Sequence, residues 1–134
     1  DPDQGVLECC EEPQNWQAYL EEEPETGLHL IPAARMTNPW RTLVASPGLP
    51  VLINLLSESY DLVVLDCPPA LRSGEGITIA SLARKCIAVT AWDETPITAI
   101  RQTVRTLQNR VGVKTAVFVN RVLPGYRFGR LRPG

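Results

Sequence analysis

Residues 60–69 read Tyr60-Asp61-Leu62-Val63-Val64-Leu65-Asp66-Cys67-Pro68-Pro69. Four apolar residues in a row, Leu62 to Leu65, form a short run without polar alternation, which is typical of a strand buried on both faces of a parallel sheet. The strand is predicted to end at Asp66, because the following prolines cannot donate to a sheet ladder. The stretch therefore indicates an α/β fold and places one carboxylate at the end of a buried strand.

Further apolar runs predict more strands, and the segments between them predict helices. The additional strands are expected at residues 28–31, 86–89 and 115–119. Helices are expected at residues 14–20, after Ser46-Pro47, at residues 73–84, and from Thr95-Pro96 to Gly112. Residues 32–45 are expected to form a loop with a turn at Asn38-Pro39.

The helix that starts at Thr95-Pro96 has the clearest pattern. Its apolar residues recur at steps of three and four, as expected for a stripe that faces a core: Ile97, Ile100, Val104, Leu107 and Val111. Strands that alternate with such helices predict an α/β domain with a parallel sheet and flanking helices. We expect one domain over residues 1–134, with a mobile tail at residues 124–134.

Composition excludes several classes of protein. The 134 residues are 44% hydrophobic and 21% charged, which is typical of a globular domain, and no apolar run is long enough to span a membrane. The four cysteines have no Cys-x-x-Cys spacing and the chain has one histidine, so a zinc site is not expected. We expect a reducing, cytoplasmic compartment. Since the sequence starts at Asp1 rather than Met, we expect an excerpt of a longer chain.

The net charge of −2 hides a gradient along the chain. Residues 1–25 carry nine acidic residues and no Lys or Arg, whereas residues 95–134 carry eight basic residues and no acid. Such asymmetry can indicate an anionic ligand, contact between copies of the chain, or two solvated faces of opposite sign. Arg101 and Arg105 lie one turn apart and away from the apolar stripe, where a solvated helix face is favoured over a contact with DNA.

Polar residues follow two of the predicted strands. In open parallel sheets ligands bind beyond the carboxyl ends of the strands, where Asp66 and the pair Asn120-Arg121 are expected. An acid at a strand tip has the form of a Walker B element, which holds Mg²⁺ beside a phosphate chain. The structural alternatives stay open: Asp66 could start a turn, and Asn120 could be a strand-end turn residue.

The segment 60–69 as a whole resembles the Walker B segment of the bacterial tyrosine kinases of exopolysaccharide and capsule export. These belong to the deviant P-loop ATPases, with the septum-site and partitioning ATPases. Three further segments are similar to family segments in the same order: Gly27 to Ala33, Asn38-Pro39 with Leu43 to Ser46, and Val119-Asn120-Arg121-Val122. The resemblance covers about residues 5–123 and implies a P-loop NTPase-like, Rossmann-like three-layer sandwich that is incomplete here.

The resemblance also implies functional residues. Asp66 is expected to hold Mg²⁺, through water, near the γ-phosphate of ATP. Asn120 is expected to hydrogen-bond the adenine edge, and Arg121 to lie over the base or toward the phosphates. Glu75 matches the position of a second carboxylate, an Asp in the family. Tyr126 is the one candidate phosphate acceptor in the tail, although a solvated tail residue is favoured.

The chain departs from the family where the phosphates bind. No Gly-x-x-x-x-Gly-Lys-[Ser/Thr] loop is present, and neither Lys85 nor Lys114 follows a glycine-rich loop. The loop and the family's second Walker segment are expected upstream of residue 1. The strand that carries the loop lies, in the family, between the strand ending at Asp66 and the strand at Ile87. Without it, those two strands are expected to pair directly or to leave backbone groups unpaired.

Three functions remain open at this point. The first is a cytoplasmic ATP-dependent protein-tyrosine autokinase domain, possible at the inner face of the plasma membrane and inactive as the isolated chain. The second is a non-catalytic scaffold that binds a membrane polysaccharide co-polymerase. The third is a partitioning-type ATPase with a DNA-contacting basic face. Self-association is expected, and DNA is not expected as a partner.

Overall fold

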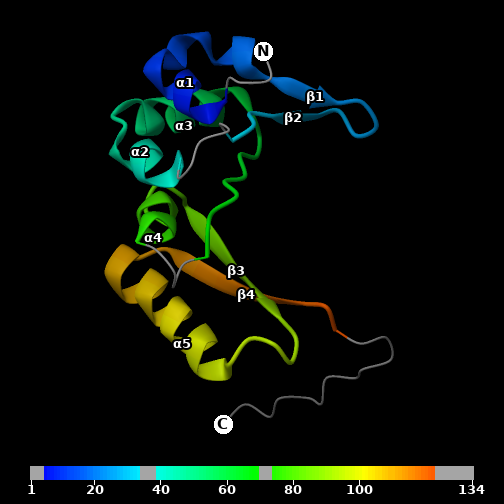
Figure 1. Ribbon diagram of the computed structural model, residues 1–134, viewed down its shortest axis with the longest axis vertical. Coiled ribbons are helices and arrows are strands. Elements are labelled where there is room, and N and C mark those ends of the chain that lie inside the picture. The colour runs from blue at the N-terminus through cyan, green and yellow to red at the C-terminus, as the bar shows by residue number, and fades with distance from the viewer. Residues whose placement is uncertain (1–4, 34–38, 70–73, 123–134) are drawn as a thin grey trace. The chain divides into compact units, whose positions relative to one another are not determined.

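The computed structural model describes residues 5–33, 39–69 and 74–122 of the chain, which divides into two compact units (Figure 1). The first unit is Asp1–Ala83 and the second is Arg84–Gly134. The predicted mobile tail at residues 124–134 lies outside the described residues. Among the described residues, no helix combines the length and the apolar character needed to cross a bilayer.

The first unit is built mainly of short helices. Its elements are helix α1 (Val6–Glu11), a 3₁₀ helix (Pro13–Tyr19), strands β1 (Glu21–Glu23) and β2 (Leu28–Leu30), and helices α2 (Pro39–Ala45), α3 (Gly48–Ser59) and α4 (Glu75–Ala80). The helix predicted after Ser46-Pro47 is confirmed as α3, and the Ser46 hydroxyl accepts a hydrogen bond from the Gly48 N–H at 3.3 Å. The predicted loop at residues 32–45 is wrong in its second half, because α2 begins at Pro39, which suits the first turn of a helix.

The core of this unit lies between α1, the 3₁₀ helix, α2 and α3. Its buried residues are Leu7, Cys9, Cys10, Trp16, Leu43, Leu49, Leu52 and Ile53. Helix α1 approaches the start of α3 so closely that a Cβ added to Gly48 would lie 1.7 Å from the carbonyl oxygen of Cys10. Burial raises the pKa of both the Cys9 and Cys10 thiols to about 11, so they are poor nucleophiles at neutral pH.

Strands β1 and β2 form an antiparallel hairpin, with Glu22 opposite His29. The turn is closed by Gly27, whose φ of 68° suits glycine, and by the Glu23 carboxylate, which accepts hydrogen bonds from the Thr26 N–H and hydroxyl. The prediction of a strand at residues 28–31 is therefore confirmed in position. Its place in a parallel sheet is wrong, because its partner is the preceding acidic segment 21–23, which can reach it through a short turn.

The segment that decided the fold prediction, residues 62–65, forms no strand with any described residue. It has no regular secondary structure, and Leu62 and Val64 are 77% and 79% exposed. The prediction of a strand buried on both faces is wrong for this structure. A strand requires a neighbouring backbone, and the described residues place none beside it.

The second unit is a β-α-β arrangement of parallel strands. Strand β3 (Lys85–Ala91) pairs with β4 (Lys114–Asn120) in the register Ala91↔Asn120, and α5 (Ile97–Thr106) connects them. A short π-helical turn (Leu107–Val111) extends α5 and ends at Gly112, whose φ of 73° is left-handed. The predicted parallel sheet with flanking helices is therefore confirmed, and among described residues the parallel sheet contains these two strands.

Helix α5 packs against β3 on one face of this pair, as Figure 1 shows. Exposure alternates along β3: Cys86, Ala88 and Thr90 are partly or fully buried, whereas Ile87 and Val89 are each 65% exposed. The apolar stripe is exposed at Ile97, the first residue of α5, and becomes buried at Leu107, in the π-helical turn that follows α5. The face of the sheet opposite α5 therefore presents apolar side chains to solvent.

Candidate functional site at the ends of the parallel strands

The parallel register brings the carboxyl ends of β3 and β4 together. Ala91 and Asn120 are register partners, and the Trp92 N–H donates to the Asn120 carbonyl oxygen at 2.9 Å, which extends the ladder by one residue. The loops that follow both strands therefore leave the sheet at the same edge. This is the edge at which parallel α/β sheets bind their ligands.

The two sequence-predicted residues at this edge, Asn120 and Arg121, form one local arrangement. Arg121 has a φ of 58°, and its N–H donates to the Asn120 side-chain oxygen at 2.8 Å. Among the described residues, the Asn120 side-chain amide nitrogen has no hydrogen-bond partner. Asn120 thus keeps its amide N–H groups available at the strand end.

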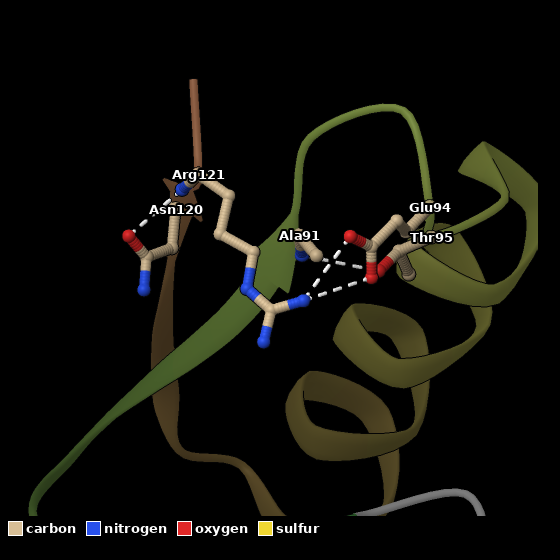
Figure 2. A network of polar contacts seen from close by, with 5 residues as sticks. All are labelled: Ala91, Glu94, Thr95, Asn120 and Arg121. Carbon is tan, nitrogen blue, oxygen red and sulfur yellow. Dashed lines mark hydrogen bonds and ion pairs between the residues drawn. The ribbon is translucent and has the colours of Figure 1, made fainter. Parts of the chain in front are cut away.

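The Arg121 side chain reaches across to the loop after β3. Its Nη1 donates to both carboxylate oxygens of Glu94, each at 3.1 Å (Figure 2). The loop itself is fixed by two hydrogen bonds, because the Ala91 N–H donates to the Thr95 hydroxyl at 3.1 Å and the Thr95 N–H returns to the Ala91 carbonyl oxygen at 3.2 Å. Residues from both strand ends therefore share one polar network.

Glu94 was missed by the sequence-based search for site residues. Its position in the sequence could have indicated a site residue, because Glu94 follows a predicted buried strand and directly precedes the helix start at Thr95-Pro96. Its pairing with Arg121 depends on the register Ala91↔Asn120, which aligns the two loops.

The other predicted site residues lie elsewhere. Asp66 and Glu75 belong to the first unit: Asp66 is exposed in a segment without regular secondary structure, and Glu75 is the first, half-buried residue of α4. Tyr126 lies outside the described residues. Asp66 does not end a strand as predicted, because residues 62–65 form none.

The fit to Mg²⁺ and a nucleotide can be tested on these residues. Among the described residues, no group of three or more His, Cys, Asp or Glu side chains could hold a metal ion. A single exposed carboxylate such as Asp66 still suits Mg²⁺, which keeps several waters and takes its remaining ligands from substrate phosphates. The strand-end network suits a base, because it offers amide N–H groups and a planar guanidinium.

The comparisons with known proteins agree with this architecture. No family model matches the chain. The chain is 28% identical over 127 residues to a protein of Ralstonia solanacearum named as tyrosine-protein kinase EpsB. The matched region covers 93% of this chain and 17% of that protein. It is 33% identical over 111 residues to a protein of Guillardia theta named as septum site-determining protein MinD. The matched region covers 81% of this chain and 39% of that protein.

Two solved structures share the fold. The kinase domain of VpsO has a TM-score of 0.79 at 24% identity, over 92% of this chain and 61% of that one. The BceF tyrosine kinase domain has a TM-score of 0.65 at 26% identity, over 84% of this chain and 48% of that one. The chain is similar to part of a bacterial tyrosine kinase domain. This tyrosine-kinase-like chain has a P-loop NTPase-like α/β fold and spans less than two thirds of the length of each of these relatives.

Proposed function

We propose that this tyrosine-kinase-like chain forms part of a cytoplasmic, ATP-dependent protein-tyrosine autokinase domain that regulates exopolysaccharide or capsule synthesis and export. The observation that carries the proposal is the polar network at the ends of β3 and β4, which contains Asn120 and Arg121, the two residues whose sequence resembles the family's Asn-Arg pair. The similarity to EpsB over 93% of the chain and to the BceF tyrosine kinase domain supports it.

In this proposal each predicted site residue has one role. Asn120 donates its amide N–H groups to the edge of the adenine ring, and Arg121 lies beside it. The Asp66 carboxylate would hold Mg²⁺, which would offset the negative charge of the phosphates, and Glu75 would supply a second carboxylate. Tyr126 is the candidate acceptor of the phosphoryl group, whose transfer ATP and Mg²⁺ make possible when they are bound.

We infer that the 134 residues alone do not transfer phosphate. The sequence has no Gly-x-x-x-x-Gly-Lys-[Ser/Thr] loop, so it lacks the backbone N–H groups and the lysine that surround the β- and γ-phosphates in such enzymes. These groups provide much of the electrostatic stabilisation of phosphoryl transfer. The purified chain should therefore show no Mg²⁺-dependent autophosphorylation, and detection of phosphotyrosine would contradict this.

A hybrid kinase domain tests the proposed function. In the hybrid this chain replaces the 61% of the VpsO kinase domain that it matches, and autophosphorylation is measured with labelled ATP. We expect activity that Asp66→Asn abolishes and that Glu58→Gln, which removes an exposed carboxylate of α3, preserves. Asp66→Asn should leave the melting temperature nearly unchanged, because Asp66 is exposed.

The same experiment decides between the kinase and a non-catalytic scaffold. A folded hybrid that does not phosphorylate itself would favour the scaffold, which binds a membrane polysaccharide co-polymerase at the inner face of the plasma membrane. We propose that partner for either function. Contacts between copies of the chain are proposed to be weak, because exposed ion pairs contribute about 0–1 kcal/mol each.

A partitioning-type ATPase is the third candidate, and one surface feature favours it. Exposed Arg101 and Arg105 line a shallow hollow on α5, together with Thr98, Gln102 and Thr106. Binding of duplex DNA that falls steeply with salt would support this alternative.

A further inference from the structure

The strand-end network contains an ion pair whose role is not explained by folding stability. The Glu94 and Arg121 side chains are 62% and 68% exposed, and exposed pairs of this kind contribute little to the stability of a fold. The pair nevertheless joins two loops that leave the sheet at the edge where ligands bind. Its effect is therefore to fix where the Arg121 guanidinium lies.

The backbone on both sides prepares this contact. Asp93 and Arg121 each have a φ of 58°, which is unusual for residues other than glycine. The left-handed turn at Asp93 and the two hydrogen bonds between Ala91 and Thr95 set the loop that carries Glu94. At Arg121, the hydrogen bond to the Asn120 side chain holds the second turn, as Figure 2 shows.

The pairing with Glu94 decides whether the Arg121 guanidinium can bind the phosphates or the base of a nucleotide. Because Glu94 is 3.1 Å from Nη1, the pair has no net charge and presents a carboxylate to any approaching anion. A triphosphate gains no net attraction from this neutral pair and would have to displace Glu94 to reach the guanidinium. A neutral heteroaromatic ring meets no such repulsion and can stack on the flat face of a guanidinium whose position is already fixed.

We propose that Glu94 is a positioning residue that holds Arg121 as a flat platform for the base of a nucleoside, and that Arg121 does not bind the phosphates. The inference rests on the proposed nucleotide site and decides between its two open roles for Arg121. Asn120 then meets the edge of the ring with its amide while Arg121 lies against its face.

Titrations of the 134-residue chain with adenosine and, separately, with inorganic tripolyphosphate test the proposal. Backbone amide shifts of residues 92–95 and 120–121 are followed by NMR in the wild type and in Glu94→Gln, Arg121→Lys and the control Glu58→Gln. Adenosine should shift these amides, and the dissociation constant should rise about two- to fivefold in both site variants, which is the range expected for an exposed cation–π contact. Glu58→Gln should match the wild type.

The variant Arg121→Lys separates the two roles, because lysine keeps the charge that a phosphate site uses but loses the plane that stacking uses. Tripolyphosphate should leave the amides at this edge unshifted in the wild type. The proposal is overturned if adenosine causes no shift at residues 92–95 and 120–121. It is equally overturned if Arg121→Lys binds adenosine as the wild type does, or if tripolyphosphate shifts these amides in the wild type. An inactive hybrid kinase with intact adenosine shifts would remove the proposed function and leave this inference standing.

Discussion

Replacing Gly48 with alanine should destabilise the first unit, although alanine is the better helix former. The added Cβ would lie 1.7 Å from the carbonyl oxygen of Cys10 and 2.8 Å from its carbonyl carbon. Both atoms belong to the backbone of α1, so no side-chain rotation can relieve the contact. To restore even a 3.0 Å separation, α1 and α3 must move apart by 3.0 − 1.7 = 1.3 Å.

That movement would loosen the best-packed part of the core. Cys9 and Leu52 are 0% and 1% exposed, and a gap of about 0.5–1 Å already forfeits a quarter to a half of a van der Waals contact. Overpacking costs about 1–3 kcal/mol or more, and the helix propensity of alanine returns about 1 kcal/mol at most. We therefore expect the free energy of unfolding to fall by up to about 2 kcal/mol.

Urea unfolding followed by far-UV circular dichroism measures this loss, and Gly74→Ala is the matched control. A Cβ on Gly74 meets nothing within 4 Å, and its φ of −69° is open to alanine. The control should be neutral or stabilising by about 0.4–1 kcal/mol. If Gly48→Ala were as stable as Gly74→Ala, the close approach of α1 to α3 would be refuted.

Two further predictions concern the first unit. Burial raises the pKa of Cys9 and Cys10 from 9.0 to about 11, so the folded chain holds these protons more tightly than the unfolded chain does. The free energy of unfolding should therefore be unaffected below about pH 9 and should fall between pH 9 and 11. Urea titrations across that range check it, and the fall should be smaller in the double variant Cys9→Ala/Cys10→Ala. Changing Glu21, Glu22 and Glu23 to lysine should weaken self-association at low salt without weakening binding to DNA, as measured by sedimentation at low and high salt with and without duplex DNA. A monomer at every salt concentration would contradict the expected association.

The second unit was the more predictable of the two from sequence. The start at Thr95-Pro96, the apolar stripe and the stop at Gly112 are local signals, and each acts within one turn of helix. Strands β3 and β4 were predicted because each is an apolar run flanking that helix, and a strand-helix-strand order favours parallel pairing. Asn120 and Arg121 could be assigned to the sheet edge for the same reason.

Elements whose state depends on a distant partner were harder to predict. No strand was predicted at residues 21–23, which follow the helix expected at residues 14–20, yet they form β1 because β2 lies a short turn away. Helix α1 carries acidic residues that obscure its pattern, and it is stabilised by packing of Leu7, Cys9 and Cys10 against the core. Glu94 is a site residue only through its contact with Arg121, which no local pattern encodes.

The stretch Leu62–Leu65 also depends on a distant partner, but here the predicted strand does not form. Its run of apolar residues specifies burial on both faces, and the structure leaves Leu62 and Val64 exposed, as it does Ile87 and Val89 on β3. A hydrophobic pattern states which side chains have to leave water, whereas the backbone partners that allow it come from other segments. The two disagree in β3 and in the segment before Asp66, which are the elements expected to flank the strand of a phosphate-binding loop. They also disagree at Phe118 of β4 and Ile97 of α5, and they agree at Leu52 and Leu107. The two elements that would flank a phosphate-binding loop are thus among those whose apolar side chains stay exposed. This agrees with the inference that these 134 residues can hold a base at the ends of β3 and β4 without being able to transfer its phosphates.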